Sequence, residues 1–214
     1  MKKKIALILI GTMLMGLTLS ACGNDKDMPK NDEKTEDSAE TSSNEENKTT
    51  FTVGFDAEYP PYGYMDENGE YTGFDLELAE AVCKLEGWEL VKKPINWDAK
   101  DMELNSGAID CIWNGFTMNG REDEYTFSIP YVDNSQVIVV AENSGINTPE
   151  DLAGKTVGVQ AASAALELLQ SDEKDGQKAL ADTFGALNEF ADYNTAFTEL
   201  QAGALDALAI DIGV

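Results

Sequence analysis

The sequence contains no histidine, and this absence excludes much of enzyme chemistry. Without an imidazole, the chain has no His acid or base, no Ser-His-Asp or Cys-His nucleophile, and few of the ligands that zinc and copper prefer. Basic residues are also scarce, with 15 Lys and Arg against 40 Asp and Glu and a formal net charge of -25. This balance argues against nucleic acid as a partner, because phosphate binding needs basic patches. We expect no metal and no cofactor.

Arginine is nearly absent, since Arg121 is the only one among the fifteen basic residues. Lysine supplies the cation everywhere else in the chain. A planar guanidinium binds a carboxylate better than an ammonium does, because two parallel N–H bonds fix its position and its plane. We therefore interpret Arg121 as a carboxylate-binding residue. The alternative is a surface arginine flanked by Glu122 and Asp123.

The first 21 residues have the layout of an export signal. Three lysines precede an apolar run over residues 5–19, and small residues lead to Cys22. The run is short for a membrane span. Residues 19–22 also resemble the bacterial lipobox, which implies cleavage before Cys22 and lipidation of its thiol. An ordinary secretory signal with an incidental cysteine is the alternative.

Residues 22–50 have almost no large apolar side chain, so they cannot bury enough surface to offset the entropy of the chain. We predict a disordered acidic tether that follows the anchor. The two remaining cysteines, Cys83 and Cys111, lie on apolar patterns of a predicted helix and a predicted strand. Buried free thiols are the favoured interpretation, and a disulfide remains open because an exported protein permits one.

The rest of the chain alternates strands and helices. We predict strands over residues 51–55, 88–91, 136–141 and 156–159, with a connecting hinge at residues 131–135. A helix capped by Asp75 should bury Leu78, Val82 and Leu85 and end at Gly87, and a second helix should begin near Ser163.

One pattern occurs twice, at residues 104–112 and 200–208. Both segments read L-x-x-G-A-[IL]-D-x-[IL], in which a helix ends at a glycine and a buried strand begins. The repeat predicts two similar units, each contributing to its own mostly parallel sheet. Ligands bind beyond the carboxyl ends of such strands, so residues 114–117 and Asp211 are candidates for ligand contacts.

Motifs over residues 51–214 resemble the polar amino-acid solute-binding proteins of bacterial ABC transporters. They include residues 53–56 with 59–62, residues 73–76, Gly115-Phe116-Thr117 with Arg121, residues 127–131, and residues 152–159. The resemblance implies an α/β fold, a two-lobed type II periplasmic-binding-protein clamp, with lobe 1 and the hinge at residues 51–134 and lobe 2 at residues 135–214. Members of the family continue beyond Asp211, so we expect this chain to lack the returning hinge strand and the last helices of lobe 1.

The resemblance also implies how the ends of an amino acid are held. Arg121 should bind the α-carboxylate, and Asp211 should pair with the α-ammonium. Thr117, by its hydroxyl, and Gly115, by its carbonyl, should add contacts. Two departures from the family pattern concern this end: the loop from Thr117 to Arg121 is one residue shorter, and Ala162 replaces a frequent glycine before Ser163, where backbone N–H groups should face the carboxylate.

The side chain of the ligand should lie between aromatic residues and amides. Tyr59 and Trp97 match two aromatic positions that sandwich its stem. The alternative is that both are core residues, although the polar neighbours of Trp97 argue against its full burial. Asp56, Asn114 and Gln160 match the far end of the pocket. Because an acid with two neutral amides disfavours a free carboxylate, we predict a glutamine-like or cystine-like ligand over glutamate.

The family's function would make this chain a monomeric lipoprotein of the Gram-positive type that hands its ligand to a membrane permease. A rival is a prephenate or arogenate dehydratase, an enzyme on the same fold, with Asp56 and Glu58 as acid and base. A third alternative is the sensor domain of a receptor kinase or of a wall-lytic enzyme, which would need a further domain.

Overall fold

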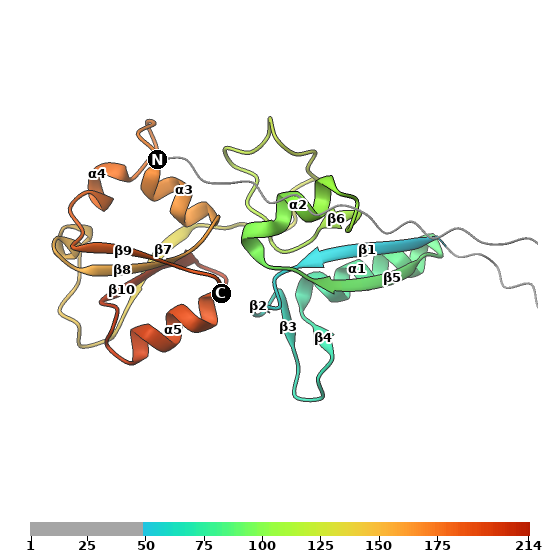
Figure 1. Cartoon of the computed structure of the whole chain (residues 1–214), viewed down its shortest axis with the longest axis horizontal. Helices are drawn as coiled ribbons and strands as arrows, with labels where there is room; N and C mark the ends of the chain where they lie inside the picture. Colours follow the sequence, from blue (N-terminus) through green and yellow to red (C-terminus); the bar gives the residue numbers. More distant parts are fainter. Residues whose placement is uncertain (1–48) are drawn as a thin grey trace, which may run out of the picture. The chain divides into compact units, whose positions relative to one another are not determined.

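The computed structural model describes residues 49–214, and these residues form three sheets (Figure 1). The predicted signal peptide, the lipidation site at Cys22 and the tether up to residue 48 lie outside the described residues. None of the helices within residues 49–214 has the length and apolar character needed to cross a membrane.

The first part of the described chain builds a parallel sheet in the order β5-β1-β6 and a small antiparallel sheet in the order β2-β3-β4. Figure 1 shows α1 alongside the β1 and β5 pair. The elements are β1 (Thr50–Phe55), β2 (Glu58–Tyr59), β3 (Gly63–Met65), β4 (Tyr71–Thr72), α1 (Phe74–Glu86), β5 (Glu89–Pro94), the 3-10 helix η1 (Trp97–Ala99), α2 (Lys100–Asn105) and β6 (Cys111–Ile112).

The second part builds a four-stranded sheet in the order β7-β10-β8-β9, in which only β7 runs antiparallel to its neighbour. Two units with mostly parallel pairing confirm the prediction from the repeated pattern. The elements are β7 (Gln136–Val140), the 3-10 helix η2 (Pro149–Leu152), β8 (Thr156–Gln160), α3 (Ala164–Gln170), α4 (Lys178–Ala181), β9 (Ala186–Phe190), α5 (Tyr193–Gln201) and β10 (Ala207–Asp211).

Strand β10 is buried along its whole length because helices cover both faces of the sheet. Successive side chains of a strand point to opposite faces. Ala207 and Ala209 therefore join the core under α3, whereas Leu208 and Ile210 join the core under α5 (Figure 1). This double cover fixes the position of Asp211 at the carboxyl end of the strand.

The repeated pattern forms the same local structure twice. Gly107 and Gly203 follow their helices with φ of 71° and 78°, a conformation that glycine adopts without strain. Asp110 then accepts a hydrogen bond from the backbone N–H of Thr52 at 2.7 Å, and Asp206 accepts one from that of Thr156 at 2.8 Å. Each aspartate thus ties the new strand to its parallel neighbour.

The predicted buried face of α1 is wrong. Leu76, Ala79 and Cys83 are buried, whereas Leu85 is 85% exposed. Leu78 and Val82 are half-buried and line a separate cavity of about 690 Å³ beside β6. The sequence showed apolar residues on two faces of the helix, and the choice between them depends on which face meets the sheet.

The predicted cap of α1 is also wrong, because the helix begins one residue before Asp75. Its N-cap is Gly73, where an added Cβ would lie 2.3 Å from the carbonyl oxygen of Tyr62. This close approach requires glycine and sets the start of the helix. Gly87 ends the helix in the left-handed conformation, as predicted.

Cys83 and Cys111 are free thiols, as the favoured interpretation expects, but only Cys83 is buried and Cys111 is half-buried. Burial raises the pKa of both thiols, that of Cys111 to about 12. Both groups therefore stay protonated near neutral pH and behave as small apolar side chains.

Candidate functional site

One small cavity brings together most of the predicted site residues. Nine of the eleven line it, together with Phe116 and Ala164, and its volume is about 20 Å³, on the order of one water molecule. The nine are Tyr59, Trp97, Asn114, Gly115, Thr117, Arg121, Gln160, Ser163 and Asp211. Asp56 and Ala162 are not among the lining residues. The predicted pair of opposite charges, Arg121 and Asp211, thus faces one shared cavity.

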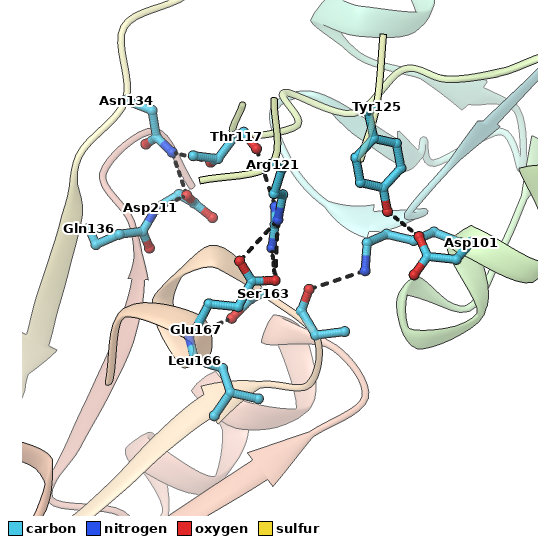
Figure 2. Close-up of polar contacts among 12 residues, drawn as sticks. Asp101, Thr117, Arg121, Tyr125, Asn134, Gln136, Ser163, Leu166, Glu167 and Asp211 are labelled. Carbon is cyan, nitrogen blue, oxygen red and sulfur yellow. Dashed lines mark hydrogen bonds and ion pairs between the residues drawn. The ribbon is translucent and has the colours of Figure 1, made fainter. Parts of the chain in front are cut away.

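Arg121 is buried, and its guanidinium is held by a carboxylate of the chain itself (Figure 2). Nε donates to Oε2 of Glu167 at 3.0 Å, and Nη2 donates to Oε1 at 2.5 Å. Nη1 donates to the carbonyl oxygen of Thr117 at 3.3 Å, and the guanidinium carbon lies 4.8 Å from the ring centre of Phe116. The arginine therefore binds a carboxylate through two donors, the geometry that the sequence suggested.

The short loop before Arg121 closes through a turn. Gly120 adopts a φ of 81°, and the N–H of Arg121 donates to the carbonyl oxygen of Met118 at 3.0 Å. Glycine adopts this left-handed conformation without strain, which lets the shorter loop close.

Asp211 ends β10, and three neutral donors surround its carboxylate. Oδ2 accepts from the hydroxyl of Tyr59 at 2.8 Å. Oδ1 accepts from the amides of Asn134 and Gln136, which Figure 2 shows beside it, at 2.5 Å each. Burial and the charge of Asp211 raise the pKa of Tyr59, so its hydroxyl stays protonated and donates. The sequence analysis missed both amides, which lie on the segment that it predicted as the hinge and at the start of the following strand.

Asp56 is hydrogen-bonded to both Asn114 and Gln160. The Gln160 amide donates to Oδ2 of Asp56 at 2.7 Å, and the backbone N–H of Asp56 donates to Oδ1 of Asn114 at 2.8 Å. Burial raises the pKa of the Asp56 carboxyl, and the hydrogen bonds that it accepts from the backbone of Glu58 and the amide of Gln160 only partly offset this effect. The network joins the carboxyl ends of β1 and β8.

Trp97 is buried with 7% exposure, so the expectation from its polar neighbours is wrong. Its ring packs edge-on against Phe116 at 5.4 Å between centroids, and the ammonium of Lys100 lies 5.2 Å from the ring centre. Lys100 is itself buried, and it also donates to the carbonyl oxygen of Ala162 at 3.3 Å. Lys100 therefore covers the ring of Trp97, although its neighbours in the sequence are polar.

Ala162 and Ser163 connect β8 to α3. Ala162 is the one non-glycine residue with positive φ in the described part of the chain, at 54°, which explains why glycine is frequent at this position. Ser163 caps α3 by accepting a hydrogen bond from the N–H of Leu166 at 3.2 Å.

Asp75 supports the loop that carries Gly115. The hydroxyl of Tyr131 donates to Oδ1 of Asp75 at 2.8 Å and accepts from the N–H of Gly115 at 3.2 Å. Oδ2 of Asp75 is buried with no partner within the described residues, and burial raises the pKa of this carboxyl to about 6. The sequence analysis took Asp75 only as a helix cap.

Comparison with known proteins places this site in a family. Residues 51–208 match the model of the bacterial extracellular solute-binding proteins, family 3. The L-cystine-binding protein TcyJ of Escherichia coli is 32% identical over 165 residues, which cover 76% of this chain and 59% of that protein. The arginine-binding extracellular protein ArtP of Bacillus subtilis is 32% identical over 164 residues, 76% of this chain and 57% of that protein. The chain thus spans less than two thirds of these relatives.

Two solved structures share the fold. A substrate-binding protein of an ABC uptake transporter from Streptococcus pneumoniae, with bound histidine, is 35% identical with a TM-score of 0.72, over 77% of this chain and 66% of that one. An ancestral arginine-binding protein bound to glutamine is 37% identical with a TM-score of 0.68, over 77% of this chain and 70% of that one. These similarities confirm the α/β fold class predicted from the sequence.

Proposed function

Because this chain belongs to family 3 of the bacterial extracellular solute-binding proteins, we propose that it captures a free polar amino acid outside the cytoplasm. It then presents the ligand to the permease of an ABC transporter. The chain performs no chemistry on the ligand in this proposal, in keeping with relatives that are named as binding proteins.

The observation that carries the proposal is the pairing of Arg121 with Asp211 at one cavity. Both side chains are buried, with 4% and 7% exposure, and they carry opposite charges. An α-amino acid has a carboxylate and an ammonium on neighbouring atoms, so one buried cation and one buried anion match its two ends. The proposal is supported by the carboxylate of Glu167, which accepts hydrogen bonds from two donors of this guanidinium.

A thermal-shift screen of the full-length protein against free amino acids tests the function. A ligand that binds only the folded state raises Tm. The Arg121→Gln variant should lose most of this shift, whereas Lys178→Gln, which removes an exposed cation paired with Asp182, should keep it. If no free amino acid raises the Tm of the unaltered protein at millimolar concentration, the proposal is wrong.

We propose a ligand with a glutamine-like or cystine-like side chain. The amides of Asn114 and Gln160 line the cavity, and Asp56, which does not line it, is hydrogen-bonded to both residues. Relatives are named for cystine, arginine and histidine, so the class of polar amino acids is broad. Isothermal titration should rank cystine and glutamine above glutamate, and tighter binding of glutamate would reverse this assignment.

Anchoring and organisation complete the proposal. Cys22 would carry the lipid, residues 22–50 would form the tether, and two lobes meeting near residue 134 would close as a monomer on the ligand. The Cys22→Ser variant should move the protein from the membrane fraction to the soluble fraction in cell fractionation, with ligand-induced Tm shifts unchanged. Retention of that variant in the membrane fraction would contradict the anchor.

The dehydratase alternative gains no support from the geometry. Asp56 accepts a hydrogen bond from the N–H of Glu58 at 2.9 Å, and its other oxygen is bonded to Gln160. Neither Asp56 nor Glu58 lines the cavity of Arg121. An absorbance assay with prephenate should show no turnover.

A further inference from the structure

The partner of Arg121 in this structure is a residue that the proposed function leaves without a role. Glu167 lies on α3, in the second unit, and reaches Arg121 in the loop after β6. The chain itself thus supplies a carboxylate at the guanidinium that the proposed function assigns to the carboxylate of a ligand.

The two partners differ in their freedom. Arg121 is 4% exposed and is also held by Thr117 and Phe116, whereas the side chain of Glu167 is 52% exposed. A half-exposed glutamate gives up little when it leaves the pair, because water solvates its carboxylate fully, so the pair can open at the side of Glu167. The buried guanidinium stays in place and needs a replacement partner.

Each nitrogen of the Arg121 guanidinium makes a hydrogen bond within the chain. Nε and Nη2 bond to Glu167, and Nη1 bonds to a backbone carbonyl. The cavity of about 20 Å³ is also far smaller than an amino acid. A ligand carboxylate can bind the edge of Arg121 formed by Nε and Nη2 only when the carboxylate of Glu167 leaves.

The opposite end of the cavity differs in one respect. The groups on Asp211 are a hydroxyl and two amides, which are neutral. Neutral donors compete less strongly with a ligand ammonium than a carboxylate competes with a ligand carboxylate. Competition by a like charge is therefore confined to the end of Arg121.

We propose that Glu167 is an internal competitor for the ligand carboxylate and sets the affinity of the site. In the free protein its side chain satisfies the buried guanidinium, and on binding the ligand displaces it into solvent. The inference rests on the proposed function. It adds that affinity is reduced by a contact within the chain, and that the reduction applies only to ligands with a free α-carboxylate.

The test compares Glu167→Gln with the unaltered full-length protein by isothermal titration. The probes are L-cystine, L-glutamine, L-arginine and L-histidine, and the α-amide of whichever of these binds most tightly. The amide of glutamine keeps the size of the side chain but removes its charge. Glu122→Gln is the matched control, because Glu122 is adjacent to Arg121 in sequence and is exposed.

We expect Glu167→Gln to bind the free amino acid about 3- to 10-fold more tightly, since a charged hydrogen-bonded partner no longer competes. The α-amide should show no such gain, and Glu122→Gln should leave the affinity for the free amino acid unchanged. The Tm without ligand should fall in Glu167→Gln, because Arg121 loses its partner.

Each other outcome has a distinct meaning. Weaker or equal binding of the free amino acid by Glu167→Gln would overturn the inference, because Glu167 would then position Arg121 instead of competing. An equal gain for the α-amide would overturn it as well. Binding of none of the probes by either protein would overturn the proposed function itself.

Discussion

The two copies of the repeated pattern share their sequence but differ in what surrounds them. The segment at residues 104–112 ends in β6, a strand of two residues at the edge of its sheet. The segment at residues 200–208 leads into β10, five buried residues between two partner strands. The glycine turn and the aspartate contact are alike in both. A local pattern therefore sets the turn and the first pairing, whereas strand length and burial depend on neighbours from elsewhere in the chain.

Shortening the side chain at the last position of each copy should give the largest difference in stability between the two copies. Leu208 is fully buried, and Ile112 is half-buried at the sheet edge. We expect Leu208→Ala to lower the free energy of unfolding by about 2–5 kcal/mol and Ile112→Ala to lower it by roughly 1 kcal/mol. Denaturant titration measures both, and equal losses would show that the two strands are equally packed.

The buried carboxyl groups also differ between the two units. Asp75 has one hydrogen-bonded oxygen, whereas Asp211 has three donors. A pKa raised from 3.8 to about 6 means that the folded state holds the proton more tightly. The tighter proton binding adds to the free energy of unfolding, and this gain is complete below pH 3.8 and lost as the pH rises through 6. The loss amounts to about 3 kcal/mol.

The Asp75→Asn variant tests that difference. Its oxygen can still accept from Tyr131, so we expect a higher free energy of unfolding than in the unaltered protein at pH 7.5, by up to about 3 kcal/mol. The gain should vanish near pH 4, where Asp75 is protonated in the folded state. Unfolding titrations at the two pH values measure it, and a gain of the same size at both would assign the effect to packing.

One glycine packs against each copy of the pattern, and replacing either by alanine should lower the stability by a similar amount. A Cβ at Gly54 would lie 2.4 Å from Cδ1 of Ile109, and one at Gly158 would lie 2.5 Å from Cδ1 of Leu205. Ile109 and Leu205 occupy the same position of the pattern. We expect Gly54→Ala and Gly158→Ala each to lower the free energy of unfolding by about 1–3 kcal/mol. A cost at only one site would mean that the other copy can shift.

The smallest expected effect concerns the turn between β8 and α3, which has no counterpart after β1. Ala162 has a φ of 54°, so Ala162→Gly relieves strain but adds entropy to the unfolded chain. These terms nearly cancel, and we expect a net gain of about 0.5 kcal/mol in the free energy of unfolding. Thermal unfolding measures the gain, and a lower Tm would show that the alanine methyl group contributes to packing.

The sequence predicted the parts of the fold and site that depend on local patterns or on resemblance. The two repeated units, the glycine turns and the shared cavity of Arg121 and Asp211 fall in this class. The buried face of α1, the burial of Trp97 and the partner of Arg121 do not. Each of these depends on side chains that are distant in sequence, such as Glu167, which lies 46 residues after Arg121 and follows no motif.

The packing of Trp97 gives the protein an intrinsic optical reporter. Of the three tryptophans, it is the one whose ring lines the cavity, against the phenylalanine that stacks on Arg121. Trp88 packs against Phe51 with its ring tilted, and Trp113 packs against the core of the first sheet. Fluorescence emission that changes with added amino acid should therefore come from Trp97, so a Trp97→Phe variant would identify the signal without any attached dye.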